Sequence, residues 1–70
     1  MKAEIGKKYR HYKGNEYEVL YIAKHTETEE EIVVYRALLD PEKIWARPRA
    51  MFEEDVEIEG RIIPRFTLIG

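Results

Sequence analysis

Short runs that alternate apolar and polar residues are the feature that most limits what this chain can fold into. One such run lies near the end of the chain, where Val56 and Ile58 alternate with glutamates. A side-chain period of two is typical of β-strands with one buried face. Runs rich in β-branched and aromatic residues also cover 18–24 and 31–39. We therefore expect a fold built from strands.

Both faces of the 18–24 run are apolar, which favours a central and strongly bent strand. Strict alternation would place Tyr17, Val19, Tyr21 and Ala23 on one face of it. In the last run, from Ile62 to Leu68, the apolar residues again share one face and oppose two arginines.

Turn signals separate these runs. Gly14-Asn15 and Glu59-Gly60 each stand between two strand-like runs and predict hairpin tips. Residues 40–43 begin with Asp-Pro, as a type I turn prefers. Pro48 ends a strand, and the residues after it have room for about one helical turn. The sequence thus predicts a single all-β domain over residues 1–70: a small SH3-like barrel of about five strands with one short helical turn. A small OB-like barrel is the second possibility.

Apolar residues on these runs give an expected core, most of it buried. Its members are Tyr17, Val19, Val33, Val34, Leu38, Trp45, Met51, Phe52, Val56, Ile62, Phe66 and Leu68. Ile44 and Ala46 are expected to form the barrel wall beside Met51 and Phe52. A core of this size leaves only ~3–5 kcal/mol of net stability unless something else stabilises the chain.

Composition excludes several classes of function. The chain has no Cys and no Ser, so most nucleophile arrangements and thiolate metal sites are absent. The acidic residues lie in charged loops or on polar strand faces. His11 and His25 lack the ligand spacing of zinc motifs. We expect no enzyme activity, no metal and no cofactor. No apolar run approaches the ~20 residues of a membrane span, and we expect a cytoplasmic protein.

Strand pairing about the predicted turns singles out two arginines. Pairing about residues 40–43 places Arg36 opposite Arg47, while pairing about Gly14-Asn15 places His11 opposite Glu18. Like charges directly opposite each other destabilise a sheet. A carboxylate of this chain, an aromatic ring such as Trp45 or Tyr35, or a ligand anion should therefore lie between the arginines.

Several motifs recur in the order found in a small, mainly bacterial family. They are Tyr-Arg-His-aromatic-Lys-Gly, His-x-x-Thr, Val-Tyr-Arg, Trp-x-Arg-Pro and Pro-Arg-Phe, and they run from about Gly6 to Phe66. The chain resembles the family of unknown function numbered sixteen fifty-three. The resemblance implies an SH3-like barrel and no established activity. The signature polar residues of that family would fall on Arg10, His11, His25, Thr28, Arg36, Arg47 and Arg65.

The expected function is binding. The candidate ligand site comprises Arg36, Arg47, Trp45, Tyr35, His11 and Arg10. One hypothesis is a protein- or peptide-interaction domain that uses this Arg and aromatic surface. The alternative is nucleic-acid or nucleotide binding through Arg36, Arg47 and Trp45, with bases stacked on the aromatic side chain. The net charge of −2 argues against tight nonspecific binding to nucleic acid.

Overall fold

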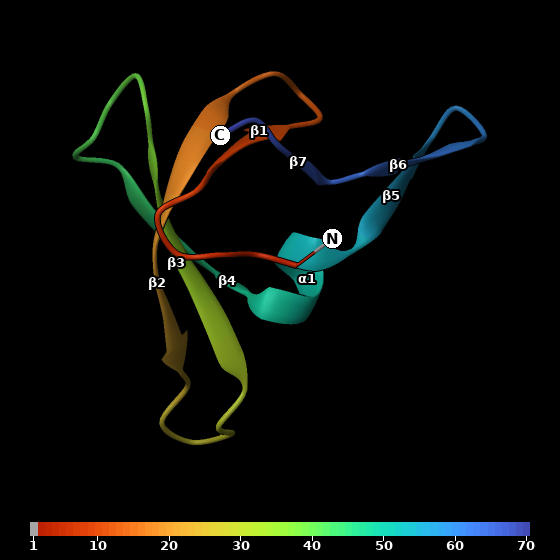
Figure 1. Cartoon of the computed structure of the whole chain (residues 1–70). Coiled ribbons are helices and arrows are strands. Elements are labelled where there is room, and N and C mark those ends of the chain that lie inside the picture. Colours follow the sequence, from red (N-terminus) through yellow and green to blue (C-terminus); the bar gives the residue numbers. More distant parts are fainter. Residues whose placement is uncertain (1) are drawn as a thin grey trace.

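The computed structural model describes residues 2–70 as seven strands and one short helix. In chain order these are β1 (Lys8–His11), β2 (Glu16–Lys24), β3 (Glu31–Ala37), β4 (Ile44–Pro48), α1 (Arg49–Glu53), β5 (Asp55–Ile58), β6 (Arg61–Pro64) and β7 (Phe66–Leu68). Five strands form an antiparallel sheet in the order β4-β3-β2-β1-β7, and β5 pairs with β6 in a separate hairpin (Figure 1). The predicted all-β class with one short helix is confirmed, although there are seven strands rather than about five.

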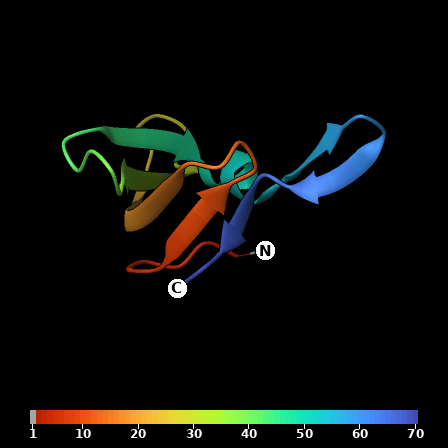
Figure 2. The same cartoon turned by 90° about the horizontal axis from the view of Figure 1, so that it is seen from above.

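The five-stranded sheet bends into a half-open barrel. Seen from above, β1 and β7 run at an angle to β3 and β4, and the β5–β6 hairpin projects away from the rest (Figure 2). The free edges are β4 and β7, and no ladder joins them within residues 2–70. The bend gives the sheet a concave face, which bears Tyr9, Tyr17, Val19, Tyr35 and Phe66. Within residues 2–70, no helix is long and apolar enough to cross a membrane.

A bulge in β2 allows the sheet to bend. Val19 pairs with Tyr35, but the next pair is Tyr21 with Val34, so one residue is skipped. An extra residue in one strand increases the local twist and shifts the alternation of side chains. Val19 is therefore fully buried on the concave face, whereas Tyr21 is 67% exposed on the convex face. The central position of β2 is confirmed, but the expectation that Tyr21 shares a face with Val19 is wrong.

The turns form where the sequence predicts them, but not always as two-residue tips. Glu59 and Gly60 both have positive φ, 51° and 79°, as a tight hairpin requires, and this tip is confirmed. Gly14 also has positive φ, yet β1 ends at His11 and the connection runs over 12–15. A turn closes at Asp40, whose carbonyl accepts from the Lys43 amide at 2.9 Å. It lies inside a longer connection that runs over 38–43.

The core is aromatic and is closed by α1. Phe52, on this helix, stacks on Phe66 with ring centroids 3.9 Å apart. It also meets Tyr9 and Tyr35 edge-on, at 5.5 and 5.4 Å. Offset or edge-to-face rings stabilise a core beyond the apolar area that they bury. The fully buried set is Ala3, Tyr9, Val19, Val33, Tyr35, Phe52 and Phe66.

The expected core is therefore correct only in part. Of its members, Val19, Val33, Phe52 and Phe66 are buried, and Tyr17, Val34, Leu38 and Val56 are half-buried. Trp45, Met51, Ile62 and Leu68 are exposed. Ile62 lies on the β5–β6 hairpin, which projects away from the five-stranded sheet (Figure 1). Ile44 and Ala46 are exposed on the convex face rather than forming an inner wall.

Arg49 joins the helix, β3 and the N-terminal segment. Its Nε donates to Glu53 Oε2 at 2.8 Å, its Nη1 to Glu31 at 3.1 Å and its Nη2 to the Ala3 carbonyl at 3.1 Å. Glu53 Oε2 also accepts from the Ala3 amide at 2.8 Å. Burial alone would raise the pKa of Glu53, but the hydrogen bonds from Arg49 and the Ala3 amide lower it overall. Bonds that favour the charged carboxylate stabilise the fold while it stays ionised.

We expect Glu53→Gln to reduce the acid sensitivity of this fold. Because the pKa of Glu53 is lower in the folded chain than its ordinary value of 4.5, its contribution is present above pH 4.5 and is lost as the pH falls through the folded pKa. Thermal unfolding between pH 7 and pH 2 measures this. The variant should be less stable than wild type at neutral pH, and the two should converge in acid. Glu57→Gln, on the exposed face of β5, is the control and should run parallel to wild type.

Candidate ligand groove on the concave face

Two adjoining hollows open on the concave face, with volumes of about 210 and 270 Å³. They share Asn15, Tyr17 and Trp45, so they form one continuous surface, which we call the concave groove. The first hollow adds Glu16, Ala37, Leu39, Asp40 and Lys43, and the second adds His11, Lys13, Tyr35, Arg47 and Phe66. The groove therefore has a mixed-charge end and a basic end.

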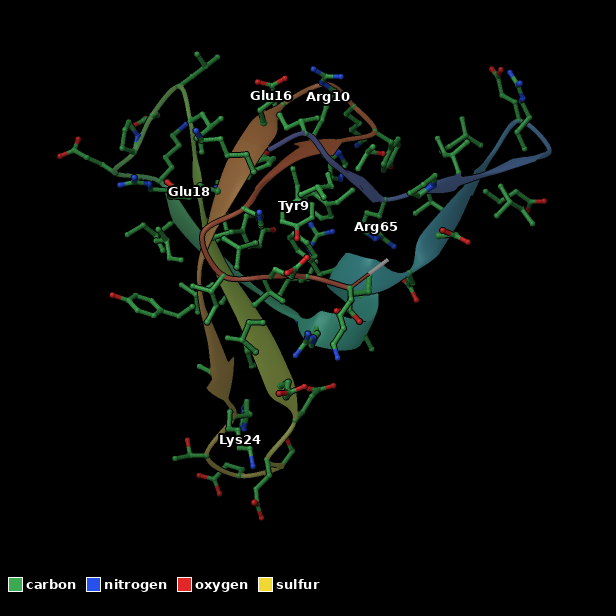
Figure 3. All side chains as sticks on the ribbon, viewed as in Figure 1. Tyr9, Arg10, Glu16, Glu18, Lys24 and Arg65 are labelled. Carbon is green, nitrogen blue, oxygen red and sulfur yellow. The ribbon has the colours of Figure 1, made fainter. Side chains whose placement is uncertain are left out.

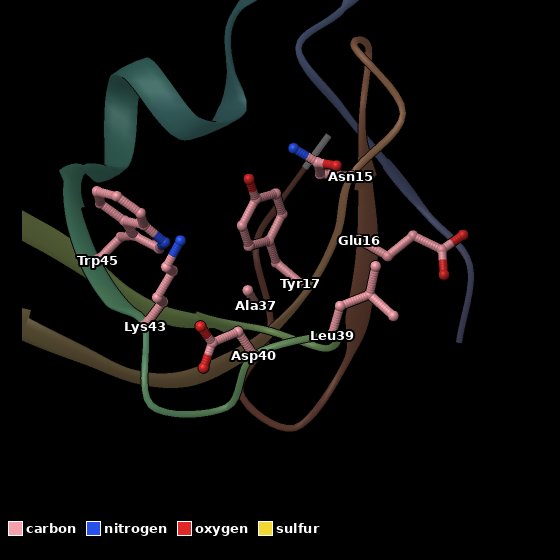
Figure 4. Close-up of a pocket in the computed structure, with 8 residues that line it drawn as sticks. All are labelled: Asn15, Glu16, Tyr17, Ala37, Leu39, Asp40, Lys43 and Trp45. Atoms are coloured by element: carbon pink, nitrogen blue, oxygen red, sulfur yellow. The ribbon is translucent and has the colours of Figure 1, made fainter.

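Strand alternation brings these side chains together. Tyr17 pairs with Ala37 in the β2–β3 ladder, and Tyr35 pairs with Trp45 in the β3–β4 ladder. Arg47 follows Trp45 by two residues, so both side chains stand on the concave face. Figure 4 shows Trp45 and Tyr17 rising from their strands toward the same side, with Lys43 projecting between them.

The floor of the groove is continuous with the core. The rings of Tyr17 and Tyr35 meet edge-on at 5.2 Å, and Tyr35 meets Phe66 at 5.7 Å. Because Phe66 also stacks on the buried Phe52, the floor is fixed by the packing of the core. A preformed floor of this kind reduces the entropy lost when a ligand is bound.

Within the described residues, Arg47 at the basic end has no carboxylate partner. The Arg47 guanidinium lies 5.5 Å from the centre of the Phe66 ring, a cation–π arrangement, and forms no ion pair within residues 2–70. His11 approaches the same ring at 5.0 Å. Burial, and then the charges of Arg47, Arg65 and Lys13, lower the pKa of His11. Positive charge is therefore concentrated here, in a chain whose net charge is −2.

The lowered pKa of His11 favours its neutral form at pH 7. Its Nδ1 accepts a hydrogen bond from the Lys13 amide at 3.1 Å. A neutral imidazole that accepts at Nδ1 carries its proton at Nε2, which makes His11 a donor in this region. Burial raises the pKa of the neighbouring Tyr35 hydroxyl, and the Arg47 charge opposes that shift.

The mouth of the groove exposes apolar side chains. Trp45 is 50% exposed and Leu39 is 97% exposed, and both line the mixed-charge end. A half-exposed Trp on an edge strand offers a large rigid surface to a partner, and such residues often dominate binding energy. The expectation that Trp45 belongs to the core is wrong because the floor beneath it is already filled by Tyr17 and Tyr35.

The predicted pairing of Arg36 with Arg47 is wrong. The β3–β4 register is shifted by three residues from the expected one: Arg36 pairs with Ile44, and Arg47 pairs with Val33. Arg36 lies on the convex face, where its Nε and Nη2 donate to Glu18 Oε1 at 3.1 and 2.8 Å. The two arginines therefore lie on opposite faces of the sheet and do not repel each other. Of the two, only Arg47 reaches the groove.

Arg36→Gln is consequently expected to affect stability slightly and binding not at all. The Arg36–Glu18 pair is partly exposed, and such pairs contribute ~1 kcal/mol or less. The predicted result is a melting temperature lower by a few degrees, with ligand affinity equal to wild type. Loss of affinity in a folded Arg36→Gln protein would place the ligand on the convex face instead.

Arg10 also lies outside the groove. It pairs with Glu16 in the β1–β2 ladder, and its Nη2 donates to Glu16 at 2.8 Å (Figure 3). The expected pairing of His11 with Glu18 is wrong, because Glu18 pairs with Lys8 and His11 pairs with Phe66 on β7. Of the candidate site residues, the structure thus brings together Arg47, Trp45, Tyr35 and His11.

The His-x-x-Thr motif shapes a loop. His25 Nδ1 accepts from the Glu27 and Thr28 amides at 3.1 and 3.4 Å, and Thr28 Oγ1 accepts from the Glu30 amide at 3.2 Å. These bonds fold the connection between β2 and β3, where Glu29 has positive φ. His25 and His11 do not converge, and within residues 2–70 no group of three or more His, Asp or Glu side chains could hold a metal ion.

Sequence reasoning missed Tyr17, Asn15 and Lys13 as groove residues. The sequence pattern predicts Tyr17 as a core residue; it lies on the predicted inner face but is only half-buried. Asn15 and Lys13 stand beside the predicted hairpin tip, so their approach to Arg47 depends on how the sheet bends. No pattern in the sequence signals that approach.

The fold and this groove define a small all-β domain with an aromatic and basic concave surface. The chain belongs to the family described as protein of unknown function (DUF1653), whose model matches residues 7–68. It is similar to a protein of that family from Bordetella bronchiseptica with a known crystal structure, at 34% sequence identity and a TM-score of 0.81. The match covers 96% of this chain and 88% of the other. No curated protein matches significantly.

Proposed function

We propose that this domain is a peptide-binding module and that the concave groove holds an extended segment of a partner protein. The observation that carries the proposal is the groove itself: exposed Trp45 and half-buried Tyr17 stand over a fixed aromatic floor, beside an arginine without an ion-pair partner in residues 2–70. Rigid aromatic rings and an Arg are the residues most enriched at binding hot spots. We propose that the domain acts in the cytoplasm and binds its partner without catalysing a reaction.

Nucleic-acid binding is the second candidate, and its support is weaker. Arg36 lies on the convex face, so the three residues first considered for base stacking and phosphate contact do not form one surface. Asp40 lines the mixed-charge end of the groove and would repel a phosphate backbone, whereas the Glu16 carboxylate is paired with Arg10. Phosphate contacts provide most of the affinity in such complexes.

The test is a titration of the ¹⁵N-labelled protein with a mixture of short extended peptides, followed by amide chemical shifts. We expect the largest changes at Tyr17, Trp45 and Arg47 and little change on the β5–β6 hairpin, which serves as an internal control. A short single-stranded oligonucleotide is titrated in parallel. Shifts confined to the convex face, or binding of the oligonucleotide alone with a steep salt dependence, would contradict the proposal.

A further inference from the structure

Most arginines of this chain form ion pairs with the chain's own carboxylates. Arg10, Arg36 and Arg65 donate to Glu16, Glu18 and Glu54 at 2.8, 2.8 and 2.9 Å, and Arg49 joins two glutamates. Within residues 2–70, Arg47 and Arg61 have no such partner. Arg61 lies on the projecting hairpin and is exposed. Arg47 is half-buried in the groove, where missing charge compensation matters more.

Resting on the proposed function, we propose that the concave groove selects an acidic peptide, with one carboxylate at Arg47 and one apolar side chain at Trp45. A guanidinium binds a carboxylate through two parallel hydrogen bonds, which makes the pair strong and directional. Lys13 adds positive charge at the same end, and His11 adds a neutral donor. The apolar partner would rest between Trp45 and Leu39.

The spacing of the two contact points fits an extended peptide. Trp45 and Arg47 are two residues apart on one strand and face the same side. In a strand each residue advances ~3.3 Å, so side chains on one face repeat every ~6.6 Å. A peptide that runs alongside β4 in an extended conformation has the same repeat. The acidic and apolar residues of the ligand should therefore be separated by one residue.

The free edge of β4 would hold such a peptide in register. The Ala37 amide donates to the Lys43 carbonyl at 3.1 Å. In the same register, the backbone groups of Trp45 and Arg47 face β3. In an antiparallel ladder alternate residues direct their backbone groups outward, here those of Ile44 and Ala46. No strand of residues 2–70 occupies that side of β4. Addition of a peptide strand to an exposed sheet edge is a common mode of recognition.

The groove favours a carboxylate over a nucleic-acid phosphate because its positive charge is local. The other end is lined by Asp40 and Lys43, and the Glu16 carboxylate beside them is already paired with Arg10. A polyanionic backbone that runs the length of the groove would meet both charge signs. A peptide with a single acidic residue at the correct position meets only the positive charge of the basic end. Binding of nucleic acid is therefore one of the outcomes that the test distinguishes.

The test compares matched short peptides by calorimetric titration. One peptide has Glu and Leu separated by one residue, in either order. The second replaces Glu with Gln, and the third places Glu and Leu side by side. The proteins are wild type, Arg47→Gln and Arg61→Gln; the last removes the same charge far from the groove. Thermal unfolding shows whether each variant is folded. If Arg47→Gln does not fold, Arg47→Lys takes its place.

We expect wild type and Arg61→Gln to bind the first peptide at least tenfold more tightly than the other two. Arg47→Gln should bind the Glu and Gln peptides equally. Equal binding of both peptides by wild type would overturn the acidic specificity while the peptide-binding function stands. If no peptide of the set binds, and the peptide mixture produces no shifts, the proposed function fails with it. Binding of an oligonucleotide in place of the peptides would also overturn the inference.

Discussion

Phe52→Ala is expected to leave the chain unfolded at room temperature. The Phe52 side chain is 0% exposed and contacts Tyr9, Tyr35 and Phe66 ring to ring. Loss of a buried Phe side chain costs ~3–5 kcal/mol, part from lost burial and part from the cavity left behind. A domain of this size has only ~3–5 kcal/mol of net stability. The single substitution therefore removes most or all of the margin.

Met51→Ala is the matched control for this experiment. Met51 is the preceding residue of the same helix and is 44% exposed. Its replacement keeps a good helix former in place and removes little buried area, so the melting temperature should change by only a few degrees. Near-ultraviolet circular dichroism and ¹⁵N spectra of both variants give the comparison. A folded Phe52→Ala protein that melts with wild type would show that α1 does not close the core.

Trp45→Ala is expected to reduce peptide affinity more than any other change in the groove. Truncation of a central Trp at an interface costs at least ~2 kcal/mol, about thirtyfold in affinity. Because half of the Trp45 side chain is already exposed, the cost in stability should be well below that of Phe52→Ala.

Tyr21→Ala provides the control for Trp45→Ala. Tyr21 is an exposed aromatic residue on a strand of the same sheet, but it lies on the convex face. Both variants lose an aromatic strand residue, so both should lose a similar amount of stability. Only Trp45→Ala should lose affinity. Equal affinity of the two variants for the peptide would move the binding surface away from Trp45.

The sequence predicts the class of the fold well because the class depends on local patterns. Alternation gives the strands, and the Glu59-Gly60 pair gives a tip whose backbone has the required positive φ. The central place of β2 follows from its two apolar faces. The short helix follows from Pro48 and the few residues available after it. Each of these features is decided within about ten residues.

Strand register is not decided locally, and the errors in the site came from it. The turn at Asp40 forms as expected, but β3 stays on β2 beyond Ala37, and the Leu38 amide donates to the Glu16 carbonyl at 3.0 Å. Leu38 and Leu39 are therefore not free to pair with β4, and the register shifts by three residues. The bulge after Val19 has a similar effect, because it moves Tyr21 to the other face.

The site could be predicted in part because alternation survives a change of register. Trp45 and Arg47 are two residues apart on β4, so they share a face in any register, and the three-residue shift places that face beside Tyr35 instead of Arg36. His11 reaches them through β1, whose partner β7 brings Phe66 beneath both His11 and Arg47. That contact depends on a bend at Arg65, between β6 and β7: its amide still donates to the Glu54 carbonyl beside β5 at 3.2 Å, while its carbonyl accepts from the Tyr12 amide beside β1 at 3.0 Å. The expected continuous run from Ile62 to Leu68 is wrong for this reason.

The central claim is that Arg47 is held at the groove for a ligand and is not needed by the fold. Thermal unfolding of Arg47→Gln beside wild type tests it without any knowledge of the ligand. Loss of the cation–π contact with Phe66 costs ~0.5–1 kcal/mol, and within residues 2–70 Arg47 forms no ion pair that the substitution would break. We predict melting temperatures within about 5 °C of each other. A loss as large as that of Phe52→Ala would show that Arg47 is part of the structural core, and it would contradict the account.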